Sequence, residues 1–162
     1  FYARMQIMRA EKTAIAARVA AMIEDGASLA IDTGSTSGFI AQALQIRKNL
    51  VVVTNSAFVA STLATVPGNR VFMAGSQLRD HDGAAFDRLA FTTIERMRAD
   101  HCILSASNVD AARGFLAYEQ GEADIAEAMQ GISDHTIMAV GHFKIPATPQ
   151  FRMWGPIALG EG

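Results

Sequence analysis

The chain has 162 residues, of which 50% are hydrophobic and 19% are charged, and its formal net charge at pH 7 is −2. This balance is ordinary for one soluble globular domain and excludes a disordered chain, and the slightly negative charge gives no sign of a surface that binds nucleic acid directly. The single cysteine, Cys102, excludes an internal disulfide and suits a reducing compartment. No apolar run approaches the ~20 residues of a membrane span, and no signal peptide is visible.

The sequence opens with a helical pattern. Apolar residues recur at helical spacing from Phe1 to Ile23, and Gly26 is placed to end the helix. The apolar stripe is longer than one domain obviously needs, so we expect residues 1–25 to form a helix that links domains or pairs subunits. Because the sequence starts inside this pattern and without a methionine, we expect residues 1–162 to be one domain of a longer protein.

Five short apolar runs then alternate with amphipathic segments. The runs are typical of buried parallel strands, and the segments between several of them suit helices. The alternation predicts a three-layer α/β domain, with a mostly parallel sheet that helices cover on both faces. The expected strands are Leu29–Ile31, Leu50–Val53, Val71–Ala74, Cys102–Leu104 and Thr136–Val140; the expected helices are Phe39–Arg47, Ser56–Thr65, Phe86–Arg98 and Glu122–Ile132; Ile145–Gly162 is expected to be irregular.

The most informative segment lies at the first strand-to-helix junction. Asp32 ends an apolar run, and residues 33–38, with the sequence Thr-Gly-Ser-Thr-Ser-Gly, open the next helix. A turn of this kind presents unpaired backbone N–H groups, the helix dipole adds partial positive charge, and proteins hold phosphate in this way. The segment matches neither the dinucleotide fingerprint nor the P-loop, and a capped strand–helix junction would use the same residue types.

Small and polar residues also follow the other expected strands. In open parallel sheets, ligands lie beyond the carboxyl ends of the strands, so the repetition predicts a small-molecule site at that edge of the sheet. Arg79 and Lys144 are the cations expected to be available to an anionic ligand. The expected ligand-binding residues are Asp32, Thr33, Gly34, Ser35, Thr36, Thr54, Asn55, Gly75, Ser105 and Lys144.

Other chemistries find less support in the sequence. The four histidines show no metal-ligand spacing, and no Gly-x-Ser-x-Gly elbow is present, so we expect no metal site, no cofactor and no catalytic residues. Two alternatives stay open. The first is an enzyme, such as a sugar-phosphate isomerase or a hydrolase that uses Asp32 or Glu122, and the second is a module that binds no ligand and serves oligomerisation.

A set of short motifs runs in order from about residue 8 to about residue 151. It resembles the effector-sensing domain of DeoR-family transcriptional regulators. No single motif is diagnostic, and the ordered set carries the resemblance. Its members are the Lys12–Gly26 helix, Asp32-Thr33-Gly34-Ser35-Thr36, Val52-Val53-Thr54-Asn55-Ser56, Met73-Ala74-Gly75, Gly83, Asp100, Gly114, Glu122-Ala123, Met129 and Phe143-Lys144.

The resemblance implies a Rossmann-like fold similar to ribose-5-phosphate isomerase and the CoA-transferases. It also implies a cytoplasmic regulator that forms a homodimer or homotetramer. This regulator would bind operator DNA through a winged helix-turn-helix that precedes residue 1. The implied effector is a phosphorylated sugar or a related metabolite. Residues 33–36 would hold its phosphate, and Asp32 would either accept hydrogen bonds from sugar hydroxyls or orient its own loop.

The chain departs from the family pattern at several positions. A lysine is usual where this sequence has Ala126, and an aspartate is usual where it has Gly141 and His142. Loss of one cation and one carboxylate changes which charges a site can pair, because an unmatched buried polar group costs ~1–3 kcal/mol. The isomerase base would fall on Ala126 and its paired aspartates near Ser105 and Asn108, and none of these can abstract a carbon-bound proton. We therefore expect a sensor that is not an enzyme.

Overall fold

A parallel five-stranded sheet forms the centre of the computed structural model, which describes residues 8–106, 108–110, 112–140 and 151–154. The strand order is β3-β2-β1-β4-β7, and every neighbouring pair is parallel, so all five carboxyl ends lie at one edge. β1 is the central strand. The strands are β1 (Ser28–Ile31), β2 (Val51–Thr54), β3 (Arg70–Met73), β4 (Ala99–Ser105) and β7 (Ser133–Ala139).

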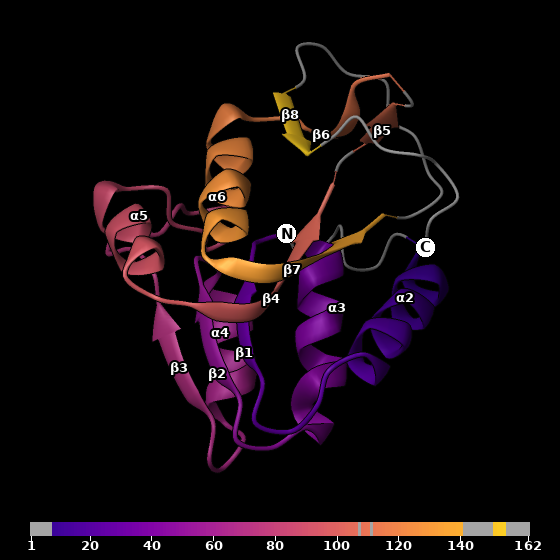
Figure 1. The fold of residues 1–162 in the computed structure, drawn as a ribbon, viewed down its shortest axis with the longest axis vertical. Helices are drawn as coiled ribbons and strands as arrows, with labels where there is room; N and C mark the ends of the chain where they lie inside the picture. The colour runs from indigo at the N-terminus through magenta and orange to yellow at the C-terminus, as the bar shows by residue number, and fades with distance from the viewer. Residues whose placement is uncertain (1–7, 107, 111, 141–150, 155–162) are drawn as a thin grey trace.

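Helices cover both faces of this sheet, which confirms the predicted three-layer arrangement (Figure 1). One face packs against α2 (Arg9–Ala21), α3 (Ser35–Ala43) and α4 (Ala57–Ala64), with the short 3₁₀ turn η1 (Leu44–Ile46) after α3. The other face packs against α5 (Arg88–Glu95) and α6 (Gln120–Gly131).

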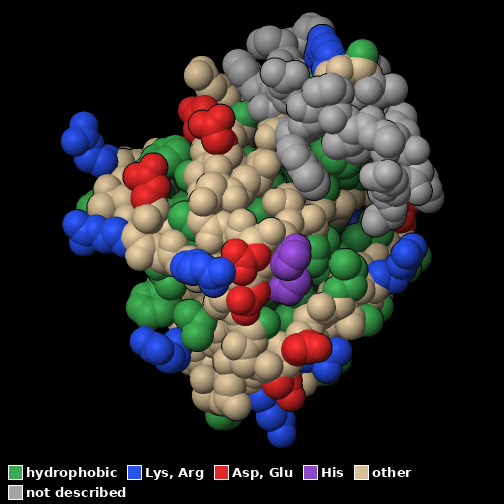
Figure 2. Space-filling view, in the orientation of Figure 1, with side chains coloured by type: hydrophobic (Ala, Val, Ile, Leu, Met, Phe, Trp, Pro, Cys, Tyr) green, Lys and Arg blue, Asp and Glu red, His purple; other side chains and the backbone are tan. Residues whose placement is uncertain are grey.

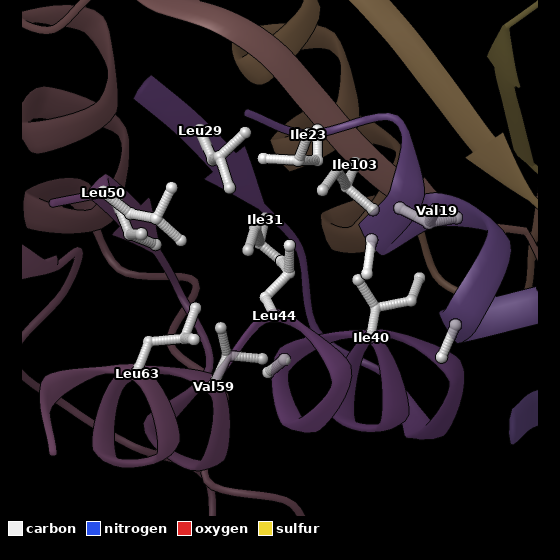
Figure 3. Close-up of a cluster of buried hydrophobic side chains, with 14 of the residues drawn as sticks. Val19, Ile23, Leu29, Ile31, Ile40, Leu44, Leu50, Val59, Leu63 and Ile103 are labelled. Carbon is white, nitrogen blue, oxygen red and sulfur yellow. The ribbon is translucent and has the colours of Figure 1, made fainter. Parts of the chain in front are cut away.

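The apolar runs form strands because both faces of the sheet are buried. On β1, Leu29 and Ile31 point into the core beneath α2, α3 and α4, whereas Ala30 lies in the core beneath α5 and α6. Figure 3 shows Ile31 and Ile103 of the sheet opposite Ile40 of α3. The inner strands β1, β2 and β4 are largely buried on both faces, which accounts for their apolar runs, whereas the edge strands β3 and β7 are partly exposed.

A second, smaller sheet was not predicted. It is antiparallel, with the order β5-β6-β8, and it lies beside α6 (Figure 1). The expectation that Ile145–Gly162 is irregular is wrong at residues 151–154, which form β8, while residues 145–150 and 155–162 lie outside the described residues. β5 and β6 pair locally, but β6 and β8 lie more than 30 residues apart, and local periodicity carries no signal for that pairing. The strands are β5 (Asn108–Asp110), β6 (Gly114–Ala117) and β8 (Phe151–Trp154).

Two of the helix starts are fixed by capping side chains. The Ser56 hydroxyl accepts a hydrogen bond from the Val59 N–H at 3.2 Å and begins α4, as predicted. The Asp87 carboxylate accepts one from the Ala90 N–H at 3.1 Å and begins α5. These short polar side chains satisfy amides that have no partner within the helix.

The first helix differs from its prediction. α2 begins at Arg9 because Met8 has a left-handed conformation, with φ 57°, so a continuous helix from Phe1 to Ile23 is wrong at that point. Residues 1–7 lie outside the described residues. The buried face of α2 consists of Lys12, Ala16, Val19 and Ala20, and it packs chiefly on α3.

We predict that Ile103→Ala lowers the free energy of unfolding by about 2–5 kcal/mol, because Ile103 is fully buried in the core between the sheet and α3. The matched control is Ile46→Ala in η1, where the side chain is 68% exposed and the change should stay within about 0.5 kcal/mol. Urea unfolding of both variants measures the difference. Equal losses in the two variants would contradict the placement of β4 in the core.

Candidate functional site

The loops after β1, β2 and β4 meet at the carboxyl edge of the central sheet. Ile31, the last residue of β1, pairs with Thr54 of β2 and with Ile103 of β4. The residues that follow these strands, Asp32 and Asn55 among them, therefore lie at adjacent positions along the edge. The structure thus brings together, at one edge of the sheet, segments that are separate along the chain.

Asp32 joins the loop after β1 to the end of β4. Its Oδ1 accepts a hydrogen bond from the Ser37 hydroxyl at 2.6 Å, and its Oδ2 accepts one from the Ser105 N–H at 2.9 Å. The Ser105 hydroxyl also lies 3.3 Å from Oδ1 and 2.6 Å from the Ser37 hydroxyl. Of the two roles that the sequence left open for Asp32, these contacts show the orientation of its own loop.

The Asp32 carboxyl is buried, and its environment changes its acidity. Burial raises the pKa of Asp32 from 3.8 to about 7, because a charged carboxylate loses its hydration there. The hydrogen bonds from Ser37 and Ser105 lower that pKa, and the charge of Glu122 raises it. The site therefore contains a carboxyl group that titrates near neutral pH.

The start of α3 carries no capping side chain from the described residues. Its N-cap is Gly34, with φ 137° and ψ 164°, a backbone conformation that favours glycine. Ser35 and Ser37 of the first turn are buried, whereas Gly34 and Thr36 are partly exposed. The helix begins four residues earlier than the predicted Phe39, so the Ser-Thr-Ser segment belongs to its first turn. Such a turn directs N–H groups and the positive end of the helix dipole outward.

Lys12 reaches this turn from α2, and the predicted list of site residues missed it. The side chain is only 3% exposed, and its Nζ donates a hydrogen bond to the Ser35 hydroxyl at 2.7 Å. A signal was present in the sequence, because Lys12 falls on the helix face of Ala16 and Val19, four and seven residues further on. A lysine on an apolar face is uncommon, since a buried ammonium group is costly without polar partners.

Two buried polar atoms at this edge have no hydrogen-bond partner among the described residues. They are Thr33 Oγ1 and Asn55 Oδ1. The amide nitrogen of Asn55 donates to the Ala85 carbonyl at 3.0 Å, so the side chain is held in place while its oxygen is left over. Because most buried polar atoms in folded proteins are paired, two such atoms at one edge indicate groups that a bound molecule could satisfy.

Other predicted site residues have contacts that shape the loops. Thr54 Oγ1 accepts a hydrogen bond from the Ser56 N–H at 3.1 Å and so holds the turn before α4. Gly75 has φ 109°, and a Cβ there would overlap the Ala85 methyl group, so the glycine allows a close backbone approach. Lys144, together with Gly141 and His142, lies outside the described residues.

Arg79 is engaged by acidic side chains. Its guanidinium lies 2.7 Å from Asp82, 2.6 Å from Glu119 and 3.8 Å from Glu122, and it stacks 4.5 Å from the centre of the Phe86 ring. A ligand anion would have to compete with these carboxylates. The expectation that Arg79 is a cation available to the ligand is therefore not supported by its contacts.

A groove of about 480 Å³ lies apart from this edge, between α5 and α6. Phe91 and Ile132 form part of its lining, and Glu95, Asp124 and Glu127 add negative charge. Figure 2 shows acidic side chains over the upper part of α6 and in the space between the two helices. This charge disfavours an anionic ligand, so the strand edge is the better candidate for one.

Two further classes of site were searched for in the described ranges. No group of three or more His, Cys, Asp or Glu side chains there could hold a metal ion. None of the helices in those ranges has both the length and the apolar character needed to cross a bilayer.

Solved structures with a similar architecture include ribose-5-phosphate isomerases and eIF2B subunits. Ribose 5 phosphate isomerase A from Neisseria gonorrhoeae superposes with a TM-score of 0.56 at 17% identity, covering 79% of this chain and 49% of that one. The eIF2B delta subunit from Chaetomium thermophilum superposes with a TM-score of 0.53 at 17% identity, covering 82% of this chain and 47% of that one. The protein is thus a three-layer α/β domain with the fold of these structures, as the sequence predicted.

The family can be stated more narrowly. The model of the DeoR C terminal sensor domain matches residues 7–155, and the chain belongs to that family. This match confirms the resemblance drawn from the ordered motifs.

Curated relatives agree with this assignment. The glycerol-3-phosphate regulon repressor of Escherichia coli (strain K12) is 34% identical over 149 residues, which cover 92% of this chain and 59% of that protein. The repressor of the same name from Haemophilus influenzae is 34% identical over 158 residues, which cover 98% of this chain and 59% of that protein. The transcriptional repressor AccR of Agrobacterium fabrum is 31% identical over 137 residues, which cover 84% of this chain and 53% of that protein. The chain therefore spans 53–59% of the length of these relatives.

The relatives are named as transcriptional repressors and not as enzymes, which supports the expectation of a regulatory sensor domain. Ala126, where the isomerase base would fall, is fully buried among apolar side chains of α6. This position offers no group that could take a proton from a ligand.

We predict that Asp32→Asn makes the free energy of unfolding less sensitive to pH. The pKa of Asp32 is about 7 in the folded protein, against 3.8 for an ordinary aspartate. Between these two pH values the folded protein retains a proton on Asp32 that the unfolded chain releases. The contribution of Asp32 to stability is therefore complete below about pH 4 and is lost as pH rises through 7, with a slope of up to about 1.4 kcal/mol per pH unit.

Urea unfolding between pH 5 and pH 7.5 measures this effect. The stability of Asp32→Asn relative to wild type should rise steadily across the range, whereas Asp124→Asn, at an exposed position on α6, should leave the pH slope unchanged. Parallel pH profiles for wild type and Asp32→Asn would contradict the raised pKa.

Proposed function

We propose that this chain is the effector-sensing domain of a DeoR-type transcriptional regulator, which acts as a repressor. The domain binds a phosphorylated sugar or polyol, and binding alters the affinity of the whole protein for operator DNA. The observation that carries the proposal is the first turn of α3, a buried helix start without a capping side chain that stands beside unpartnered polar atoms. Family membership supports the regulatory role.

The anionic group of the effector binds at residues 33–36 in this proposal. Backbone N–H groups of the first turn and the hydroxyls of Thr33, Ser35 and Thr36 donate hydrogen bonds to it, and the helix dipole favours its negative charge. Asn55 and Lys144 contact the remainder of the effector, and Ser105 lies beside it. Thr54 and Gly75 hold the loops that surround the effector, and Asp32 keeps the first turn in place.

The effector is a small phosphorylated polyol or sugar. Two of the relatives, at 34% identity, are named for a glycerol-3-phosphate regulon, which supports this chemical class for a domain of the same family. A ligand of this kind combines one strongly charged group with hydroxyls. The unpartnered Asn55 oxygen is suited to accept a hydrogen bond from such a hydroxyl.

The DNA-binding function lies outside this chain in the proposal. Operator DNA is bound in the cytoplasm by a winged helix-turn-helix that precedes residue 1. The net charge of −2 gives no sign that this domain binds DNA directly, and the chain covers only 59% and 53% of two repressor relatives. Two-fold symmetric operators are read by paired subunits, so a homodimer or homotetramer fits the role. α2 is the described helix nearest in sequence to that DNA-binding segment.

We predict that Ser35→Ala/Thr36→Ala weakens binding of glycerol 3-phosphate by about tenfold or more, because two hydrogen bonds to a charged group are lost. Isothermal titration calorimetry of glycerol 3-phosphate, ribose 5-phosphate and unphosphorylated glycerol measures this. Ser61→Ala/Thr62→Ala removes the same two side chains from α4, away from the site, and should bind as wild type does.

Two results would contradict the proposal. Equal affinity in wild type and Ser35→Ala/Thr36→Ala would remove the site from the start of α3. Failure of the wild-type chain to bind any phosphorylated compound would favour a domain that binds no ligand and serves oligomerisation.

A further inference from the structure

Two positive features converge on Ser35. One is the ammonium group of Lys12, which donates to the Ser35 hydroxyl at 2.7 Å from a side chain that is almost fully buried. The other is the N-terminal end of α3, where the helix dipole places partial positive charge. A cation beside a helix N-terminus opposes the usual preference for negative charge there. An anion bound at this point would contact both the Lys12 ammonium group and the first turn of α3.

Independent evidence for a ligand comes from the neighbouring side chains. Thr33 directly precedes the N-cap of α3, is more than nine-tenths buried, and its hydroxyl has no partner among the described residues. Asn55, fully buried on the adjacent loop, has an unpartnered oxygen. A ligand that placed an anion between Lys12 and the first turn of α3 would bring further polar atoms within reach of these two groups.

Acidic groups also lie near this point. Asp32 is the carboxylate of the loop, and its oxygens accept hydrogen bonds from Ser37 and Ser105. Burial raises the pKa of Asp32 to about 7, and the charge of Glu122 raises it as well. A phosphate bound at the first turn of α3 would therefore join a site that holds both an ammonium group and acidic side chains.

We propose that Lys12 is the cation of the effector site and that the effector's phosphate bridges its ammonium group to the first turn of α3. The inference rests on the proposed function, and it adds a ligand-binding residue that comes from a different helix. The phosphate takes over the Ser35 hydroxyl's place as acceptor for Lys12, with a shorter and stronger charge-assisted contact. Occupancy then joins α2 to α3 through the ligand.

This bridge explains how binding reaches the rest of the protein. Lys12 lies in the first turn of α2, four residues after the left-handed residue Met8. An anion that draws in the Lys12 side chain fixes α2 against α3 at this end. A segment that precedes α2 would be repositioned with it, because the helix transmits a displacement along its axis as a rigid unit.

The test compares Lys12→Met with Arg18→Met, which removes an exposed positive charge from the same helix. Thermal unfolding with and without inorganic phosphate, and calorimetric titration of glycerol 3-phosphate, are measured for both. We expect Lys12→Met to have an unchanged or higher Tm without ligand, because a buried charge is removed, and to bind glycerol 3-phosphate at least about tenfold more weakly. Arg18→Met should match wild type. Lys12→Gln, which keeps a hydrogen-bond donor without the charge, should lose affinity as Lys12→Met does.

Hydrogen exchange then tests the bridge itself. Phosphate ligand should slow amide exchange in both α2 and α3 of the wild type, whereas in Lys12→Met at saturating ligand the slowing should persist in α3 and disappear from α2. Wild-type affinity in Lys12→Met and Lys12→Gln, with Ser35→Ala/Thr36→Ala still impaired, would overturn the role of Lys12 and leave the site standing. Absence of binding by wild type would overturn the proposed function and this inference together.

Discussion

The hydrogen bonds of Asp32 are the constraint on which the candidate site depends. This one carboxylate holds Ser37 of the first turn of α3 and both the backbone and the hydroxyl of Ser105 at the end of β4. The loop between them is thereby fixed against the central strand, and Gly34 supplies the positive φ that the sharp entry into the helix requires. The cost of burying the carboxyl is offset by these three donors and by its capacity to hold a proton near neutral pH.

The central sheet was predictable from sequence because its inner strands are largely buried on both faces and its edge strands, β3 and β7, still carry short apolar runs. The small sheet was not, since β6 and β8 pair across more than 30 residues and neither carries a local signal for its partner. The predicted start of α3, Phe39, is four residues too late. Ser, Thr and Gly have low helix propensity, so residues 35–38 carry no local signal that they form the first turn of this helix. The Asp32 loop was recognised from its composition. Lys12 was not predictable as a neighbour of the Asp32 loop, because the packing of α2 on α3 that brings it to Ser35 has no local signal in the sequence.

The fold and the chemistry of this domain are separable. Distant structures with the same architecture include isomerases, yet at the position where a catalytic base would fall this chain has Ala126, packed among apolar neighbours on α6. The Arg79 guanidinium forms ion pairs with Asp82, Glu119 and Glu122. The strand edge combines a helix start, a buried lysine and two unpartnered polar atoms, which supports the proposal that this domain binds a molecule without catalysing its reaction.

The order in which the chain is synthesised gives the Asp32 contacts a further meaning. Lys12 and Ser35 are 23 residues apart and emerge from the ribosome together, whereas Ser105 follows Asp32 by 73 residues. β1 therefore lacks its neighbour β4 until most of the domain has been synthesised. A nascent chain that ends at β3 has the helix start but lacks the strand that holds it. The proposed ligand site is thus completed late in translation, and a chain that stops before β4 lacks part of it.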